Sequence, residues 1–294
     1  MSLVQWRDGA VDVAAASELS TGELLALIPI LLSLAEQGEA LPEGLPPEAL
    51  HAARFIGMTV ERVRQAARHD ALAGARTVLS AVRQQGRRLA AAQQGVEDPD
   101  VLQHLHAVDH ANAVAERRAV RLMILSGGWP AARTEPAPLI DVIRAGAAAV
   151  EGYERILFGG NLQLLTHPQA VGPLVAAVAE LAENGLRAGT GPVGIEVGER
   201  TEDGSTWLMV TDPGPGMPAE VLATARQVLA AGGRRPSAAA WPGHGLRLVA
   251  AVTRALNLQV GLASSPDHGT RVSVLLPPHI VEHPALAPAA PEPN

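Results

Sequence analysis

The sequence of 294 residues contains no cysteine and no lysine. The lack of cysteine excludes disulfides, thiolate metal sites and thiol nucleophiles. All 23 basic residues are arginine, so a P-loop is excluded as well, because that phosphate-binding loop needs its lysine. Aromatic residues make up only 2% of the chain and alanine is plentiful, which favours helices that pack closely through small side chains.

The charge pattern gives no support for nucleic-acid binding. The formal net charge is -7, and no continuous basic face with interleaved aromatic residues is found. The longest apolar stretch, 24–35, contains Pro29 and is shorter than the ~20 residues that a bilayer span needs. The N-terminus also lacks the pattern of a signal peptide. We therefore expect a cytoplasmic protein without a direct membrane span and without a nucleic-acid partner.

Residues 1–50 predict a short helical N-terminal region. The sequence Ser20-Thr21-Gly22-Glu23 has capping-box spacing and precedes the apolar run 24–34. Pro42, Pro46 and Pro47 then interrupt the helical pattern.

Residues 51–130 predict a helical hairpin. The segment 52–94 contains no proline, and its apolar stripe is formed by Leu72, Ala75, Leu79, Val82 and Leu89. Asp98-Pro99 is typical of a helix start, and a second helix is expected to end near Ser126. Its apolar side is formed by Leu102, Leu105, Val108, Ala115, Ala119, Leu122 and Leu125. A single hairpin cannot bury both stripes, so we expect a homodimer with a four-helix bundle.

Residues 138–277 predict a layered α/β domain, because helical and strand-like segments alternate there. The expected strands are 154–158, 161–165, 193–199, 206–211, 258–263 and 270–276, and the expected helices are 139–150, 171–188, 218–231 and 244–256. The final segment, 278–294, is rich in proline and alanine, and we expect it to be disordered. The predicted fold class is therefore α+β, with the hairpin before an α/β sandwich.

Three segments of this domain carry residues suited to nucleotide chemistry. Glu180, Asn184 and Arg187 have helical spacing, and an acid, an amide and an arginine on one face can hold hydrated Mg²⁺ and a polyphosphate. The segment Asp212-Pro213-Gly214-Pro215-Gly216 follows a predicted strand. Its carboxylate can accept a hydrogen bond from an adenine amino group, and its glycines allow close backbone approach. Gly243-His244-Gly245 opens a predicted helix, whose N-terminal amides can bind phosphate.

In order and spacing, these segments resemble the N, G1 and G2 boxes of the GHKL ATPases, the fold of sensor histidine kinases, gyrase-like ATPases and Hsp90. Gly269-Thr270 resembles the closing Gly-Thr of that family, and the resemblance covers roughly 150–277. It implies an ATP site in which Asn184 chelates Mg²⁺, Asp212 binds adenine and Arg187 lies near the phosphates. The other residues that the resemblance assigns to the nucleotide are Gly214, Gly216, Gly243, Gly245 and Thr270. It also implies a lid over about 224–242 that contains Arg234 and Arg235.

A helical hairpin before such a domain resembles the dimerisation and phosphotransfer region of sensor histidine kinases. The segments Val108-Asp109-His110 and 123–128 resemble a group of actinobacterial sensor-kinase-like proteins. This resemblance implies a phosphoacceptor histidine on the first helix and a response regulator as partner. His69 with Asp70 offers a nucleophile beside a base, and His110 on the second helix is the rival.

Two alternatives to an active histidine kinase stay open. Ala188 stands where the family often has an aromatic residue, and the expected lid is short, which is typical of a degenerate kinase that signals without phosphotransfer. Glu180 stands where gyrase-like members carry the general base for hydrolysis, so a GHKL ATP hydrolase is the other alternative. A set of glycine-rich loops that binds nothing is disfavoured, because three of them occur in the family's order.

Overall fold

The computed structural model describes residues 6–7, 10–11, 47–160, 163–199, 201–232 and 244–282. The chain divides into two compact units, Met1–Asp70 and Ala71–Asn294. In the first unit, strands β1 (Trp6–Arg7) and β2 (Ala10–Val11) pair in antiparallel orientation. The helix expected at 24–34 lies outside the described residues.

The predicted hairpin is confirmed as helices α2 (Pro47–Gln93) and α3 (Pro99–Leu125). The helix α2 begins at Pro47, where a break was expected, because proline lacks an N–H group and fits the first turn of a helix. The carboxylate of Asp98 caps α3 by accepting hydrogen bonds from the backbone N–H groups of residues 100 and 101, at 2.9 and 3.3 Å. Within the second unit, the two helices pack through a small apolar cluster formed by Leu72, Ala75, Leu79, Ala119, Val120 and Met123.

Two residues of the apolar side predicted for α3 are exposed in the single chain. Val108 and Leu122 are 46% and 48% exposed, whereas Asn112 and Arg117 are buried. The reason is that α3 contacts α5 (Pro168–Ala188) and α7 (His244–Ala255) of the following domain. A helix with neighbours on several sides does not bury a single apolar stripe, and a charged side chain can be buried there when it is paired.

The main sheet of the second unit has five strands in the order β4-β6-β7-β9-β8. Only β4 and β6 are parallel, and the other neighbours are antiparallel. Their bounds are β4 Ile156–Gly160, β6 Val193–Val197, β7 Thr206–Asp212, β8 Gln259–Ser265 and β9 Gly269–Leu276. Along β7 every second residue is buried, as expected for a sheet with one face against helices.

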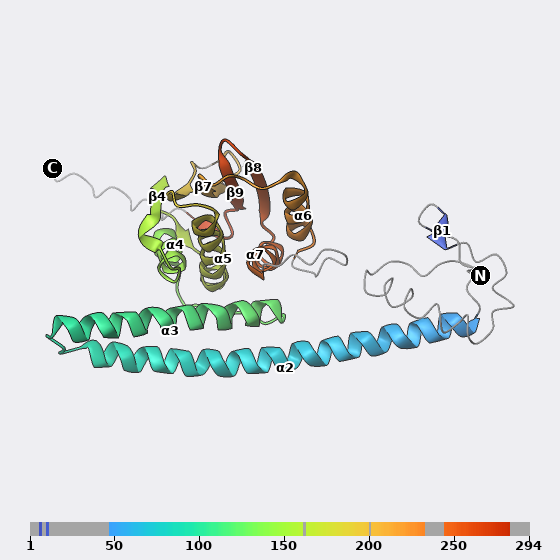
Figure 1. Ribbon diagram of the computed structural model, residues 1–294, viewed down its shortest axis with the longest axis horizontal. Coiled ribbons are helices and arrows are strands. Elements are labelled where there is room, and N and C mark those ends of the chain that lie inside the picture. Colours follow the sequence, from blue (N-terminus) through green and yellow to red (C-terminus); the bar gives the residue numbers. More distant parts are fainter. Residues whose placement is uncertain are drawn as a thin grey trace, which may run out of the picture. The chain divides into compact units, whose positions relative to one another are not determined.

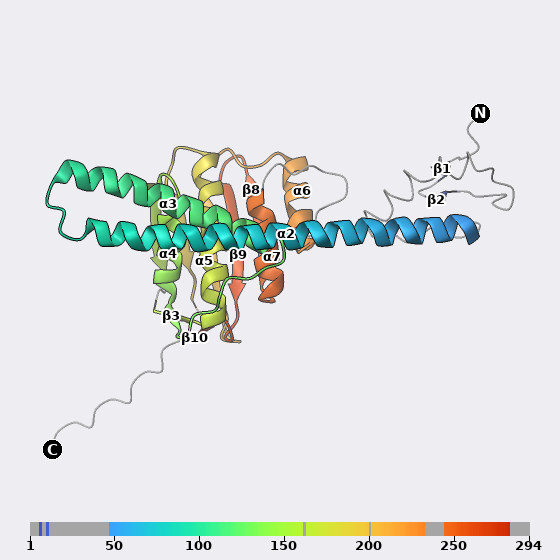
Figure 2. The same cartoon turned by 90° about the horizontal axis from the view of Figure 1, so that it is seen from below.

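The helices α4 (Leu139–Ala148), α5 and α7 form a layer on one face of this sheet, with α6 (Ala219–Ala230) beside α7 (Figure 1). Figure 2 shows α3 on the outer side of that layer. The core between helices and sheet includes the fully buried Ile143, Leu174, Ile195 and Leu208. The α+β fold with a sandwich after the hairpin is therefore confirmed. No helix among the described residues is long and apolar enough to cross a bilayer.

A second, three-stranded sheet joins distant parts of the chain in the order β10-β5-β3. It consists of β3 (Ala137–Pro138), β5 (Leu165–Thr166) and β10 (Val281–Glu282), and a 3-10 turn at Tyr153–Arg155 precedes β4. The strand expected at 161–165 is thus shorter and later in the sequence. The expectation of disorder from 278 onwards is also wrong for 278–282, because Ile280 and Val281 are buried and Val281 pairs with Thr166. Residues 283–294 lie outside the described residues.

Candidate functional site

Helix α5 places its three predicted site residues in different surroundings. Glu180 is only 1% exposed, whereas Asn184 and Arg187 are exposed. The buried residues of α5 are otherwise almost all small or aliphatic. A carboxylate inside such a layer needs partners, because an unpaired buried charge is costly.

The partners of Glu180 come from α3. Arg121 donates hydrogen bonds from Nε and Nη2 to Oε1 of Glu180, at 2.9 and 2.6 Å. Glu183 accepts from Nη1 of Arg117 at 2.6 Å and from Nη2 of Arg121 at 3.0 Å. Arg187 adds an ion pair with Glu183 along α5. The resulting ion-pair cluster, formed by Arg117, Arg121, Glu180 and Glu183, links the hairpin to the α/β domain.

The pKa values of the two carboxylates of this cluster are shifted in opposite directions. Burial raises the pKa of Glu180, and the charges and hydrogen bond of the neighbouring arginines only partly offset that effect. Burial also opposes ionisation of Glu183, but the hydrogen bond and charge of Arg117, with the charges of Arg187 and Arg121, outweigh burial and lower the pKa of Glu183. A raised pKa suits a general base that works near neutral pH.

The start of α7 lies against Glu180. A Cβ atom at Gly245 would come within 2.6 Å of Oε2 of Glu180. A glycine therefore leaves the space that the carboxylate occupies, and the structure brings these two predicted residues together. Gly243, Arg234 and Arg235, which were also predicted to belong to the site, lie outside the described residues.

Asp212 stands at the end of β7 and is 7% exposed. Its Oδ1 accepts a hydrogen bond from the backbone N–H of Gly214 at 2.9 Å. Burial raises the pKa of Asp212, and backbone hydrogen bonds from Gly214 and Thr270 reduce that rise without cancelling it. Thr270 pairs with Asp212 across the β7–β9 ladder.

The loop after Asp212 needs its glycine. Gly216 has a φ of 72°, a conformation that favours glycine, and a Cβ atom there would lie 2.4 Å from the carbonyl oxygen of Ser265. The next residue of the loop, Met217, donates its N–H to Oγ of Ser264 at 2.8 Å. Helix α5 packs against Asp212 near its C-terminal end, since a Cβ atom at Gly185 would lie 3.4 Å from Cβ of Asp212. Asp212, Gly214, Gly216 and Thr270 therefore form one cluster beside α5, which we call the Asp212 cluster.

The candidate phosphoacceptors lie on the hairpin helices. His69 and Asp70 are exposed on α2, at the end of the first unit, and His110 is half-buried on α3 in the second unit.

Sequence reasoning missed the arginines of the ion-pair cluster. Arg117 and Arg121 are four residues apart on α3, and Glu180 and Glu183 are three apart on an apolar helix. Both spacings place the two side chains on one side of a helix. Two acids on the apolar face of α5 were the signal that a pair of cations lies opposite.

A known protein family matches a large part of this domain. Residues 170–280 match the family of histidine kinase-, DNA gyrase B-, and HSP90-like ATPases. This segment is a GHKL domain. The match begins inside α5 and ends just before β10, so it contains Glu180, Asn184, the Asp212 cluster and the start of α7.

Several solved structures are similar to the chain. The histidine kinase domain of the blue-light activated histidine kinase from Erythrobacter litoralis EL346 has 17% identity and a TM-score of 0.38, covering 67% of this chain and 94% of its own. The mycobacterial sensor histidine kinase MprB has 23% identity and a TM-score of 0.38, covering 49% and 97%. Full-length ShkA in complex with AMPPNP has 15% identity and a TM-score of 0.41, covering 74% and 45%.

Proposed function

We propose that the protein is a cytoplasmic sensor histidine kinase-like protein that binds Mg²⁺-ATP in its GHKL domain and autophosphorylates on histidine for two-component signalling. The observation that carries this proposal is the Asp212 cluster inside a GHKL domain that follows a helical hairpin. The hairpin supplies exposed histidine, and the domain supplies a buried carboxylate beside a glycine-shaped loop.

The Asp212 cluster fits an adenine base. The carboxylate of Asp212 uses Oδ1 for the N–H of Gly214, and a carboxylate has about four acceptor positions in all, so it can also accept from an exocyclic amino group. Because Asp212 is buried, that hydrogen bond would be little weakened by water. The backbone at Gly214 and Gly216 would lie against the base, and Thr270 would hold the carboxylate from β9.

The exposed end of α5 fits a metal–phosphate group. Within the described ranges, no three histidine or acidic side chains are grouped to hold a metal ion by themselves. Mg²⁺ commonly takes one or two protein oxygens and completes its shell with water and phosphate oxygens. The amide oxygen of Asn184 would be that protein ligand, and Arg187 and the backbone at Gly243 and Gly245 would contact phosphates. Bound Mg²⁺ would supply positive charge to the leaving phosphates.

His69 is the phosphoacceptor that we propose. Its imidazole is exposed, as a nucleophile for a separate domain must be, and the carboxylate of Asp70 is exposed beside it. The imidazole nitrogen would bond to the γ-phosphorus as the bond to the ADP oxygen breaks, and Asp70 would accept the imidazole proton. His110 is half-buried and is the alternative acceptor. A response-regulator aspartate would then receive the phosphoryl group.

We propose that a second copy of the chain covers the exposed apolar side chains of the hairpin. Val78 on α2 is 51% exposed, and Val108 and Leu122 on α3 are exposed to a similar degree. Apolar side chains repeated along a hairpin favour pairing into a four-helix bundle. Sedimentation of the full chain tests this proposal: a dimer supports it, and a monomer at all concentrations contradicts it.

A GHKL ATP hydrolase is the second candidate, and the raised pKa of buried Glu180 favours it. In that reaction Glu180 would take a proton from the water that attacks the γ-phosphorus, while the bond from that phosphorus to the ADP oxygen breaks. Arg121 holds this carboxylate at 2.6 Å, so the ion-pair cluster would have to rearrange before Glu180 meets the water.

The deciding experiment incubates purified full-length protein with Mg²⁺ and γ-labelled ATP. Wild type is compared with His69→Ala, His110→Ala, Asn184→Ala and Glu180→Gln. Acid-labile label that disappears in His69→Ala and Asn184→Ala supports the kinase, and loss in His110→Ala instead moves the acceptor to α3. Phosphate release that persists in His69→Ala and stops in Glu180→Gln selects the hydrolase. ATP binding without label or phosphate release selects the degenerate kinase.

A further inference from the structure

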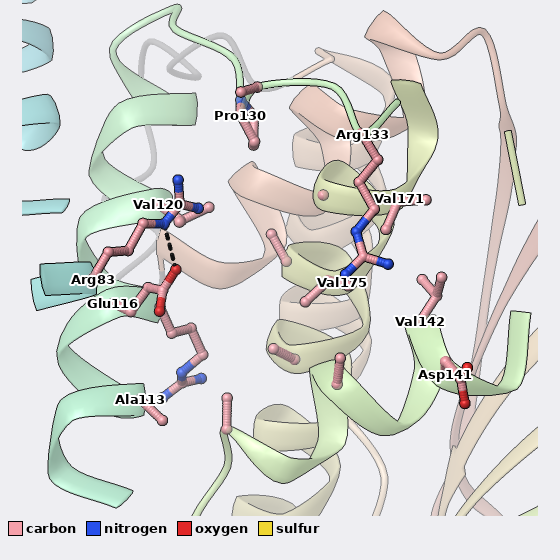
Figure 3. A pocket seen from close by; sticks show the side chains of 17 residues that line it. Arg83, Ala113, Glu116, Val120, Pro130, Arg133, Asp141, Val142, Val171 and Val175 are labelled. Carbon is pink, nitrogen blue, oxygen red and sulfur yellow. Dashed lines mark hydrogen bonds and ion pairs between the residues drawn. The ribbon is translucent and has the colours of Figure 1, made fainter. Parts of the chain in front are cut away.

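A cavity of about 450 Å³ lies between the hairpin and the helices α4 and α5. Figure 3 shows Arg83, Glu116 and Val120 on its hairpin side, with Arg133 and Val175 across from them. Its volume falls within the range of roughly 300–1,000 Å³ that is usual for small-molecule sites. No residue assigned above to the nucleotide lines this cavity, so it is a separate candidate site.

The inner wall of the cavity is apolar. It includes Val142 on α4 with Val171 and Ala176 on α5, and all three are buried. Such a wall favours the apolar body of a ligand, because that body then leaves water.

The cavity is lined by side chains of both charges. Three arginines, Arg83, Arg117 and Arg133, stand against two acids, Glu116 and Asp141. Arg83 donates to Glu116 at 2.8 Å, so this pair is neutral. The guanidinium group of Arg133 makes no hydrogen bond or ion pair with any residue that the structure describes. Arg117 is also paired, with Glu183, and Asp141 is the acid of the lining outside these two pairs. Arg133 is therefore the cation of the lining that can bind a ligand anion.

A buried donor also lines this cavity. Arg117 is 9% exposed, and its Nε atom is buried without a hydrogen-bond partner among the described residues. Leaving such a donor unpaired is unfavourable, and an acceptor on a ligand would satisfy it. The Nη1 atom of the same guanidinium group donates to Glu183 at 2.6 Å, and Glu183 directly precedes Asn184 on α5.

We propose that this cavity binds a small amphipathic carboxylate, and that its occupation changes the affinity of the GHKL domain for nucleotide through Arg117. The second half rests on the proposed nucleotide binding. The ligand carboxylate binds Arg133 and Arg117, and its apolar chain lies against Val142 and Val171. Arg117 then shares its charge between the ligand and Glu183, which alters the ion-pair cluster beside Asn184. By linkage, nucleotide changes the affinity for the carboxylate by the same factor.

The binding test uses sodium octanoate as the probe, with octanamide and octylammonium as neutral and cationic controls. Isothermal titration of the full chain is expected to show one octanoate per chain and much weaker binding of both controls. Equal affinity for octanamide, or preference for octylammonium, contradicts an anion site.

Matched variants locate the probe. Arg133→Gln is expected to weaken the affinity for octanoate by about 10- to 100-fold, the range for a hydrogen bond to a charged group. Arg144→Gln, on the exposed side of α4, is the control and is expected to leave this affinity unchanged. Ala145→Phe fills the cavity from an exposed position and is expected to abolish binding. Ala148→Phe, also exposed on α4 but outside the cavity, is its control. Octanoate binding that survives Ala145→Phe contradicts the proposed location.

The coupling test repeats an ATP titration with and without saturating octanoate. An ATP affinity that changes in wild type but not in Ala145→Phe supports the coupling, and an unchanged affinity in wild type overturns it. A protein that binds octanoate at this cavity but never binds ATP refutes the proposed function and leaves the carboxylate site standing.

Discussion

Arg121 on α3 and Glu180 on α5 form a double hydrogen bond, with Nε and Nη2 of the arginine 2.9 and 2.6 Å from the same carboxylate oxygen. Glu180 is 1% exposed and faces Gly245 at the start of α7 on its other side. The hairpin therefore contacts, through one charged pair, a residue at the centre of the GHKL domain's helical layer.

Removal of Arg121 is expected to destabilise the second unit. Arg121→Met leaves the carboxylate of Glu180 buried with less compensation, and the expected loss is about 2–4 kcal/mol of unfolding free energy. Urea unfolding followed by circular dichroism measures the loss. Arg118→Met, on the exposed side of α3, is the matched control and is expected to stay within about 0.5 kcal/mol of wild type.

The double variant Arg121→Met with Glu180→Gln measures the interaction energy between these two side chains, apart from the loss of stability that each single variant causes. Because neutral glutamine does not need a cation, the double variant is expected to be less destabilised than the sum of the two single variants. If the two losses simply add, the hydrogen bonds between these side chains contribute nothing to stability.

Asp212→Asn is expected to weaken ATP binding and yet stabilise the fold at neutral pH. The loss of the charged acceptor predicts a fall in affinity of about 10- to 100-fold, measured by calorimetry. Since the folded-state pKa of Asp212 lies above its ordinary value of 3.8, its ionised form disfavours folding, and the neutral amide relieves that cost.

The pH dependence of the Asp212→Asn effect has a definite sign. As the pH falls through the raised pKa of Asp212 towards 3.8, the wild type takes up a proton in the folded state and gains stability relative to the variant. The stability advantage of Asp212→Asn should therefore shrink on acidification. An advantage that grows at low pH contradicts the raised pKa.

The contribution of Glu183 to stability is expected to depend on pH with the opposite sign to that of Asp212. Its pKa lies below the ordinary value of 4.5, so it contributes stability that is present above pH 4.5 and is lost as the pH falls through the lowered pKa. Glu183→Gln is expected to lose about 1–3 kcal/mol at pH 7 and to approach the wild type as the pH falls through the lowered pKa of Glu183. Urea unfolding of both proteins at pH 7, 4 and 3 tests this, and a difference that does not vary with pH is evidence against the ion pair.

Gly245→Ala is expected to disturb the start of α7. The added methyl group would lie 2.6 Å from Oε2 of Glu180, and Arg121 restrains that carboxylate, so the expected loss is about 1–3 kcal/mol together with weaker ATP binding. Gly194→Ala in β6 is the control, because a Cβ atom there meets nothing within 4 Å. Equal unfolding free energies for the two variants would show that α7 moves aside without cost.

The sequence by itself determined the elements whose pattern is local. The period of Leu72, Ala75 and Leu79 predicted the first hairpin helix, since helical neighbours along the chain define a stripe. The order of Glu180–Arg187, Asp212–Gly216 and Gly243–Gly245 predicted the GHKL domain, which the family match confirms. The roles of His69, Asn184 and the other individual site residues stay predictions.

The tertiary structure alone decided which side chains meet across the chain. Arg121 and Glu180 are 59 residues apart, and β10 pairs with β5 through strands of only two residues. Neither contact leaves a periodic signal, because each depends on the packing of α3 on the helical layer and of the C-terminal residues on a distant strand. The burial of Arg117 and the exposure of Leu122 have the same cause: a helix between two neighbours takes its buried face from their positions as well as from its own apolar pattern.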